Sequence, residues 1–300
     1  MAEPAIQYFN RYTGKIEMEK VYGDSFLRFT YGNPLGRLAL HAIIKRAAFS
    51  RWYGWRMDRP ASQSKIRPFI QEYAVDVREF ADAPVSFRTF NEFFYRKLRP
   101  SARPVAADQR TAVFPADGRH LGFPDISKID SVFVKGQRFD LDALIVDRTL
   151  ANRYRDGTLI MSRLCPVDYH RFHFPVGGVP SAPQLINGPL CSVNPIALRQ
   201  NLGYLIENKR WRCSVESPEF GSMLTFEVGA TCVGATDYTF APGQPVAKGA
   251  EKGFFKFGGS STITLFEKGR LQLASDLIEN TRQQRELYAR IGDVMGRLVS

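Results

Sequence analysis

The sequence predicts an α+β protein in which a helical N-terminal region packs on a strand-rich domain, with a helix at the C-terminus. Apolar residues recur at helical spacing as far as Leu98, whereas short β-branched and aromatic runs separated by Gly, Pro and Asn follow Pro104. We therefore expect residues 1–104 to form the helical region and residues 105–300 to form the strand-rich domain.

The first helix is expected from Gly36 to Trp55, where basic residues are interspersed among apolar ones. Such a helix is basic and amphipathic, and Trp52-Tyr53-Gly54-Trp55 adds aromatic rings beside arginines, as in helices that lie at a membrane surface. A helix that packs on a core and exposes a basic face is the alternative. The apolar positions are Leu38, Leu40, Ile43, Ile44, Ala47, Ala48 and Trp52, and the basic ones Arg37, Lys45, Arg46 and Arg51.

Two more helices are expected in the N-terminal region, over residues 64–72 and 87–98. Beyond the prolines that follow, apolar and β-branched runs predict strands, for example at 224–228 and 262–266. The stretch from Glu279 to Leu298 is charged with spaced apolar residues, which predicts the C-terminal helix.

Composition narrows the classes of function. The chain has 300 residues, of which 44% are apolar, so it can bury a substantial core. Its 41 Lys and Arg residues outnumber 30 Asp and Glu residues, giving a formal charge of +11. This charge predicts attraction to a polyanion, either anionic lipid or nucleic acid, without choosing between them.

The cysteines, the first residues and the apolar segments indicate where the protein is expected to be found. No Cys-x-x-Cys pair occurs, so neither a zinc site nor a disulfide scaffold is indicated, and a reducing compartment is expected. The first residues do not resemble a signal peptide, and no segment is apolar enough to span a bilayer. A chain of this kind that meets a membrane is expected to lie on its surface.

Histidine is scarce, and two of the four histidines, His170 and His173, fall in one cluster, Tyr169-His170-Arg171-Phe172-His173-Phe174-Pro175. The cluster is therefore a candidate for a catalytic base. A structural role is the alternative, and an alternating strand would place the two rings on opposite faces. A metal site would need a third ligand that no nearby residue supplies, so no metal is expected.

Two other segments carry reactive residue types. Asp117 stands between Pro and Gly in Pro115-Ala116-Asp117-Gly118, where an ordinary turn is the simpler explanation. Phe257-Gly258-Gly259-Ser260-Ser261 joins a flexible Gly-Gly pair to hydroxyl residues, and a turn between strands again suffices. Glycine also permits backbone geometry that brings a following hydroxyl onto the preceding carbonyl. Together with a histidine, these segments supply a hydroxyl nucleophile, a base and an orienting carboxylate.

The sequence resembles the phosphatidylserine decarboxylase family through several motifs in one order, which together cover nearly the whole chain. They are Phe93-Phe94-Tyr95-Arg96-Lys97-Leu98 with Arg103-Pro104, Pro115-Ala116-Asp117-Gly118, the His170 and His173 cluster, Ser192-Val193-Asn194-Pro195, Val228-Gly229-Ala230 and Gly253-Phe254-Phe255-Lys256-Phe257-Gly258-Gly259-Ser260.

The resemblance implies an enzyme that cuts itself between Gly259 and Ser260 and turns Ser260 into a pyruvoyl group. It assigns Asp117, His173 and Ser260 as the catalytic set for cleavage, and it leaves His170 for the substrate. Residues 105–300 would then be the catalytic domain. A large chain, 1–259, and a small chain, 260–300, would remain associated as a heterodimer.

The resemblance also implies the reaction. The pyruvoyl group would form a Schiff base with phosphatidylserine in an anionic membrane and yield phosphatidylethanolamine and CO2. A peripheral protein at the cytoplasmic face of the cell membrane is expected, without a nucleic-acid partner.

Some alternatives stay open at this point. Many members of the family have Leu-Gly-Ser-Thr where this chain has Gly-Gly-Ser-Ser-Thr, so Ser261 competes with Ser260, although the family spacing favours Ser260. A Ser-His-Asp hydrolase would keep one intact chain. A basic lipid- or nucleic-acid-binding module would leave the motifs unexplained, and a related decarboxylase could act on another headgroup or a soluble amino acid.

Overall fold

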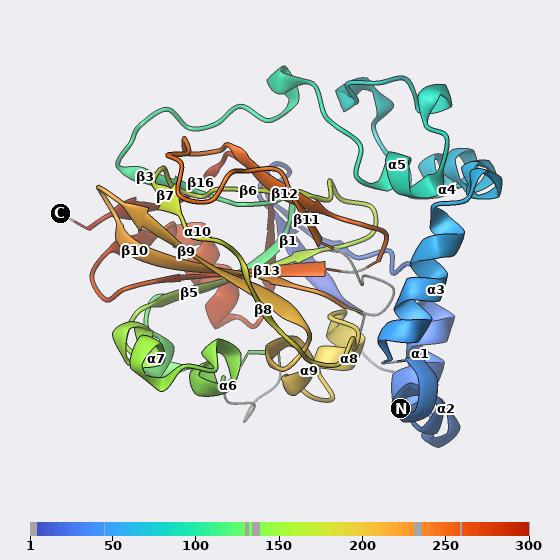
Figure 1. The fold of residues 1–300 in the computed structure, drawn as a ribbon, viewed down its shortest axis with the longest axis horizontal. Helices are drawn as coiled ribbons and strands as arrows, with labels where there is room; N and C mark the ends of the chain where they lie inside the picture. The colour runs from blue at the N-terminus through green and yellow to red at the C-terminus, as the bar shows by residue number, and fades with distance from the viewer. Residues whose placement is uncertain are drawn as a thin grey trace.

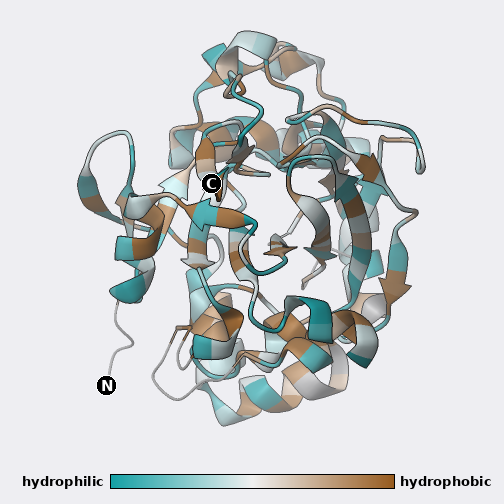
Figure 2. Ribbon diagram, turned by 90° about the vertical axis from the view of Figure 1, so that its left-hand side faces the viewer, coloured by the Kyte–Doolittle hydropathy of each residue, from teal (hydrophilic) through white to brown (hydrophobic). Residues whose placement is uncertain are grey.

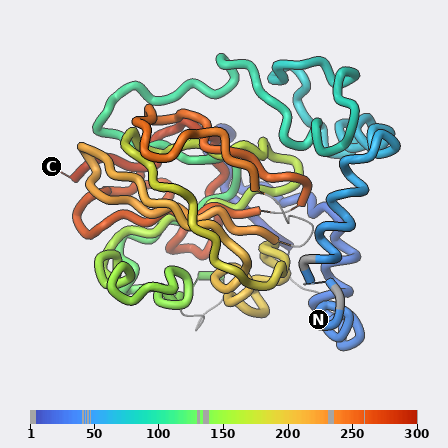
Figure 3. Tube along the Cα trace, viewed as in Figure 1, coloured from blue at the N-terminus to red at the C-terminus, as the bar shows by residue number. Residues whose placement is uncertain are grey.

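The computed structural model describes residues 5–44, 46–129, 132–133, 139–230, 236–258 and 260–299. Helices and β-sheets both make up this part of the chain, which confirms the predicted α+β class. The helices nearest the N-terminus gather along one side of a strand-rich body, and the C-terminal end of the chain lies toward the opposite side (Figure 1 and Figure 3).

The helices on that side are short and interrupted. In order they are α1 (Asp24–Gly32), α2 (Pro34–Ala39), a π-helical turn (Leu40–Ile44) and α3 (Ala47–Met57). The side chain of Asn33 caps α2 by accepting a hydrogen bond from the backbone N–H of Leu35 (2.9 Å). The sequence predicts one helix from Gly36 to Trp55, but the structure has two helical segments there. They are separated at Arg46, whose backbone is extended (φ −79°, ψ 140°). Lys45 lies outside the described residues.

These helices have both a core face and an exposed apolar face. Leu40 and Ile44 are buried, whereas Leu38, Trp52 and Trp55 keep 67%, 49% and 53% of their surface exposed. Among the described helices, none combines the length and the apolar character needed to cross a membrane.

Two further helices complete the N-terminal region. α4 (Ile66–Tyr73) agrees closely with the helix predicted over 64–72. α5 (Phe90–Phe94), capped by Thr89, is shorter than the predicted 87–98. The chain leaves the helix because Leu98 pairs with Phe80 in an isolated β-bridge.

In the described part of the chain, the main sheet has ten strands. They are β1 (Gln7–Asn10), β2 (Lys15–Met18), β4 (Gly118–Phe123), β5 (Thr158–Leu164), β7 (Val179–Pro180), β8 (Gln184–Ile186), β9 (Arg210–Ser217), β10 (Gly221–Val228), β13 (Ser260–Phe266) and β15 (Glu286–Ala289). The order is β2-β1-β15-β4-β5-β13-β10-β9-β7, with β8 also paired to β9. All pairs are antiparallel except β1 with β15.

The strands β10 and β13 contain the runs predicted as strands at 224–228 and 262–266. β13 lies in the middle of the sheet between β5 and β10, and every residue of it is buried. Ile263 and Leu265 face one core cluster, and Phe266 joins a second cluster on the other face. Two covered faces explain why this strand has no exposed residue.

Two small sheets and several helices cover the main sheet. The sheets are β11-β12-β6, from β6 (Arg171–His173), β11 (Thr236–Tyr238) and β12 (Glu251–Phe255), and β14-β16-β3, from β3 (Thr111–Val113), β14 (Leu271–Leu273) and β16 (Val294–Leu298). The helices are α6 (Leu141–Ile145), α7 (Arg148–Tyr154), α8 (Pro195–Leu198), α9 (Gly203–Ile206) and α10 (Ser275–Arg282). Hydrophobic and hydrophilic residues are interspersed along the helices and strands of the fold (Figure 2).

The predicted C-terminal helix is wrong beyond Arg282. α10 begins earlier than Glu279, and Gln284 then adopts a left-handed backbone (φ 54°), which ends the helix. The last residues form β15 and β16, because Leu287 and Ala289 are buried against the sheet. Residues 7–18 also contribute two strands to the main sheet, and the domain boundary at residue 104 stays a prediction.

Candidate active site

Ser260 is the first residue of β13 and lies opposite Leu164 of β5. Its side chain is fully buried, and its Oγ has no hydrogen-bond partner among the described residues. Just before it the chain crosses from β12, in a small sheet, to the main sheet. Gly258 in this crossing has φ 140°, a conformation that favours glycine, while Gly259 lies outside the described residues.

Ser261 points to the opposite face of the strand. Its Oγ donates a hydrogen bond to the backbone carbonyl of Ser162 (3.0 Å). The hydroxyl of Ser261 is therefore occupied, whereas that of Ser260 is available for chemistry.

His170 immediately precedes β6 and is fully buried. Its ring packs on Phe94 with 3.9 Å between centroids, and its Nδ1 lies 3.0 Å from the carbonyl oxygen of Asp168. Burial lowers the pKa of His170 to about 3, although the backbone of Gly258 lies close enough to oppose that shift. The ring is therefore neutral, with Nδ1 donating, and Nε2 has no hydrogen-bond partner in the part of the chain that the structure describes.

His173 ends β6 and has the same arrangement. Its Nδ1 lies 2.9 Å from the carbonyl oxygen of Gly249, and its Nε2 is buried without a partner in the described ranges. Burial lowers the pKa of His173, and the carbonyl of Gly249 and the charges of Glu251 and Asp117 oppose this. His173 is thus a neutral imidazole whose Nε2 can accept a proton.

Asp117 lies between β3 and β4 and is almost fully buried. Nε and Nη2 of Arg103 donate hydrogen bonds to its carboxylate (2.9 and 2.6 Å), and the backbone N–H of Ile291 donates a third (2.9 Å). Arg103 also pairs with Glu79. We did not predict a role for Arg103 from the sequence, although it stands in the Arg103-Pro104 motif.

The described contacts do not join Asp117, His173 and Ser260 by hydrogen bonds, but residues next to them in the chain or in the sheet pack in one small apolar cluster. Ala116 precedes the aspartate, Phe172 precedes the histidine, and both pack in a cluster with Leu164, the partner of Ser260 in the sheet. The described contacts do not place Nε2 of His173 or Oγ of Ser260 in any hydrogen bond.

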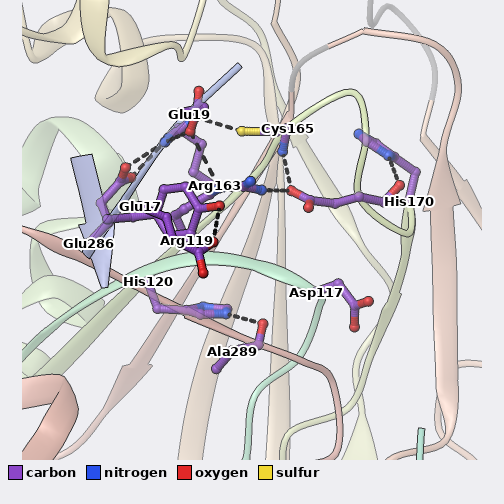
Figure 4. Close-up of polar contacts among 12 residues, drawn as sticks. Glu17, Glu19, Asp117, Arg119, His120, Arg163, Cys165, His170, Glu286 and Ala289 are labelled. Atoms are coloured by element: carbon purple, nitrogen blue, oxygen red, sulfur yellow. Dashed lines mark hydrogen bonds and ion pairs between the residues drawn. The ribbon is translucent and has the colours of Figure 1, made fainter. Parts of the chain in front are cut away.

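A buried ionic network beside these residues also escaped sequence reasoning (Figure 4). Arg163, at the end of β5, pairs with Glu19 (2.7 Å) and with Glu286 of β15. Arg119 of β4 pairs with Asp168, the residue whose carbonyl holds His170. The network therefore links the N-terminal segment and three strands of the main sheet to the orientation of His170.

Comparison with known proteins identifies the family. The family model described as phosphatidylserine decarboxylase matches residues 90–296. The chain belongs to the phosphatidylserine decarboxylase family. It is 42% identical over 291 residues to a phosphatidylserine decarboxylase proenzyme of Fusobacterium nucleatum, covering 97% of each chain. Similar proenzymes occur in Desulfitobacterium hafniense (41%, covering 97% of this chain and 98% of that one) and Chlamydia muridarum (42%, covering 98% and 97%).

Membership of the phosphatidylserine decarboxylase family makes the chain a decarboxylase of phospholipid metabolism and confirms the resemblance seen in its motifs. The family match includes Asp117, both histidines of the cluster and Ser260. The roles of these residues stay predictions.

A cavity of about 360 Å³ in this phosphatidylserine decarboxylase family member opens beside Gly258. It lies between the helices α1 and α3 and the end of β5, and its lining is mainly apolar. The lining includes Phe26, Leu27, Phe49, Tyr53, Cys165, Val193 and Phe257. Across the ranges that the structure describes, no group of three His, Cys, Asp or Glu side chains is arranged to hold a metal ion.

Proposed function

We propose that this decarboxylase converts phosphatidylserine to phosphatidylethanolamine and CO2 with a pyruvoyl group that it makes from its own Ser260. The observation that carries the proposal is the hydroxyl of Ser260, which is fully buried, has no hydrogen-bond partner among the described residues and lies two residues after Gly258, whose φ of 140° favours glycine. A buried hydroxyl without a partner is costly, and a role in the reaction is one reason for such a group to be kept.

Self-cleavage would begin when Oγ of Ser260 attacks the carbonyl carbon of Gly259 and gives up its proton to Nε2 of His173. The peptide bond breaks and an ester forms. Loss of the Cα proton of Ser260 then breaks its Cβ–Oγ bond, which releases the carboxylate of Gly259 and leaves a dehydroalanine. Addition of water and loss of ammonia give the pyruvoyl group. The neutral imidazole with a free Nε2 suits His173 to accept the first proton.

Asp117 would act on His173 by its negative charge. Arg103 pairs with the buried carboxylate of Asp117, and the charge of Asp117 opposes the lowering of the His173 pKa by burial. Arg103 is in this view a positioning residue for Asp117.

His170 would serve the substrate. The ring is held by Phe94 and by the carbonyl of Asp168, and its Nε2 has no hydrogen-bond partner among the described residues. The backbone of Gly258 is near enough to oppose the lowering of the His170 pKa by burial, so the ring lies beside the segment before the cut. It can therefore accept or hold a proton near the position that the pyruvoyl group would occupy. A pyruvoyl group supplies a ketone that accepts electrons from the bond to the departing CO2.

A lipid substrate is supported by the apolar cavity beside Gly258 and by the apolar side chains exposed on α1, α2 and α3. The cavity would take the apolar part of the lipid, and the exposed side chains would enter the membrane surface beside basic residues. The exposed residues are Phe26, Phe29, Leu35, Leu38, Trp52 and Trp55.

The two products of cleavage would stay together as a heterodimer. The small chain would contain β13, which pairs with β5 and β10, and β15, which pairs with β1 and β4. All four neighbours belong to the large chain. Separation would break hydrogen bonds on both sides of both strands and expose buried apolar residues.

The test is the intact mass of the purified protein under denaturing conditions, followed by an assay on vesicles. We expect a large chain that ends at Gly259 and a small chain from position 260 without its amino group. Ser260→Ala should stay full length and inactive. Phosphatidylserine should be decarboxylated, with free serine as the comparison substrate. An active, folded wild type with one uncut chain would refute the proposal and favour a hydrolase that uses the same residue types.

A further inference from the structure

We propose that the N-terminal helical region positions the segment before the cut through a clamp formed by Asn91 and an aromatic cage around Phe257. The inference rests on the proposed self-cleavage at Ser260. It assigns to α5 and α3 a part in processing, in addition to any part in membrane binding.

The polar half of the clamp is one side chain, that of Asn91, whose three hydrogen bonds include a long one from Nδ2 to the carbonyl of Gly54 in α3 (3.4 Å). Asn91 of α5 is completely buried. Its Oδ1 accepts a hydrogen bond from the backbone N–H of Phe257 (2.8 Å), and its Nδ2 donates one to Oδ1 of Asp58 at the end of α3 (2.8 Å). Asp58 thus holds the amide in the orientation that presents its oxygen to Phe257.

The apolar half is the cage that surrounds the ring of Phe257. Four aromatic rings lie with their centroids 4.9–5.7 Å from it, and all belong to the first 94 residues. They are Tyr22, Tyr53, Phe90 and Phe94. Phe257 itself is 3% exposed. Its side chain and its backbone N–H are therefore both held by the N-terminal region, which lies far away in sequence.

The clamp matters because the segment before the cut is short. On one side Ser260 is fixed in the middle of the main sheet. On the other side Phe257 is fixed by the clamp, and only Gly258 and Gly259 stand between them. Glycines alone would let the scissile bond sample many orientations. Fixing both ends reduces that freedom, and attack by a neighbouring hydroxyl is sensitive to misplacement of about 1 Å.

The cage also connects this segment to a histidine. Phe94 contacts Phe257 on one side and His170 on the other, at 4.9 and 3.9 Å between centroids. A shift of α5 would therefore move the segment before the cut and the ring of His170 together.

The experiment follows cleavage of newly synthesised chains over time by mass, alongside their melting temperature. Asn91→Ala should slow cleavage by roughly tenfold or more, because the Phe257 N–H loses its acceptor. Asn280→Ala is the matched control: Asn280 is also buried, and its amide donates to Asp276 and accepts from Arg285 in and after α10, away from the clamp. It should lower the melting temperature and leave the rate of cleavage unchanged.

Asp58 gives a second variant at an exposed position, where folding is not at risk. Asp58→Ala should slow cleavage, whereas Asp58→Asn should restore it, since an amide oxygen can still accept from Nδ2 of Asn91. Rescue by the conservative variant would not be expected if Asp58 acted only through its charge. Asn91→Ala combined with Asp58→Ala should be no slower than Asn91→Ala alone.

The outcomes separate the two proposals. A wild type that is never cut would overturn the proposed function itself. Cleavage in the wild type but not in Ser260→Ala, together with a wild-type rate in Asn91→Ala and Asp58→Ala, would overturn the clamp and leave the self-cleavage intact.

Discussion

The guanidinium group of Arg103 donates hydrogen bonds to both carboxylate oxygens of Asp117 and also forms an ion pair with Glu79. Burial would lower the pKa of Arg103, but the charges of Asp117 and Glu79 raise it instead, so the arginine stays charged. Asp117, which we predicted as the partner of His173, therefore forms an ion pair with Arg103 of the N-terminal region.

Arg103→Ala should destabilise the fold and slow cleavage, because it leaves the buried carboxylate of Asp117 without its cation. Removing one partner of a buried ion pair costs about 3–5 kcal/mol. Urea unfolding in a Ser260→Ala background measures the stability, and mass analysis of the single variant measures the cleavage. The control is Arg78→Ala, because Arg78 and Asp76 form a similar pair on the surface. It should change neither quantity, and equal effects of both variants would contradict the role given to Arg103.

Ser261→Ala should leave self-cleavage nearly unchanged, since the hydroxyl of Ser261 is already engaged with the carbonyl of Ser162. The loss of that single hydrogen bond should cost about 1 kcal/mol of stability. Mass analysis of Ser260→Ala and Ser261→Ala side by side decides between the two serines. An uncut Ser261→Ala chain with a wild-type melting temperature would show that we chose the wrong nucleophile.

Gly258→Ala should hinder cleavage, because a φ of 140° is strained for any residue with a Cβ. The strain should cost on the order of 1–3 kcal/mol or force the segment into another conformation. Gly54→Ala in α3 is the control, since an added Cβ there meets nothing within 4 Å. It should be neutral or slightly stabilising. Normal cleavage of Gly258→Ala, measured by time-resolved mass analysis, would mean that this backbone conformation is not required.

The free energy of unfolding should fall as the pH falls below the ordinary pKa of histidine, 6.5. Burial, assisted by the charge of Arg96, lowers the pKa of His170 to about 3, below its ordinary 6.5. Between these two values the unfolded chain binds a proton that the folded chain excludes. The free energy of unfolding should therefore drop as the pH falls from 6.5 towards 3, by up to ~1.4 kcal/mol per pH unit for this residue.

The check on this prediction is His170→Gln in a Ser260→Ala background, with urea unfolding measured at several pH values. In the variant, the free energy of unfolding should depend less steeply on pH, by an amount that corresponds to about one proton. His120, whose burial also lowers its pKa to about 3, should keep contributing and serves as the internal comparison. The same slope with and without His170 would rule out its neutral, buried state.

Replacing two exposed leucines of α2 should weaken binding to vesicles. Leu35 and Leu38 are 70% and 67% exposed, and each would contribute about 1.5 kcal/mol or more if it entered the lipid. The double variant Leu35→Ser with Leu38→Ser should therefore reduce binding to phosphatidylserine-containing vesicles by at least roughly tenfold. Val85→Ser, at a position 87% exposed outside these helices, is the control. Unchanged sedimentation of the double variant with vesicles would exclude α2 from the membrane contact.

The sequence was most informative where structure depends on local patterns. The helix at 66–73 and the strands β10 and β13 were predictable from apolar spacing and β-branched runs. The C-terminal strands were not, because the spacing of Leu287 and Val294 also fits a helix, and only pairing with β1, β4 and β3 selects the extended form. The break near Arg46 likewise leaves no clear mark in the apolar pattern.

In the candidate site, too, some residues could be predicted from the sequence and others could not. Asp117, His170, His173 and Ser260 could be named from scarce residue types and ordered motifs. Arg103 and Asn91 could not, because their roles arise from contacts with residues 14 and 166 positions away in the chain. Long-range contacts of this kind follow from the folded sheet and have no local signature.

The position of β13 and β15 in the main sheet bears on the timing of events during synthesis. Ser260 begins β13, which lies between β5 and β10, and in the described part of the sheet the edge formed by β1 and β2 pairs with the other strands through β15, at residues 286–289. A chain still emerging from the ribosome cannot pair this edge with the rest of the sheet until residues 286–289 have been made. If pairing of this edge is what activates Ser260, then translation itself delays the cut until β15 has been made.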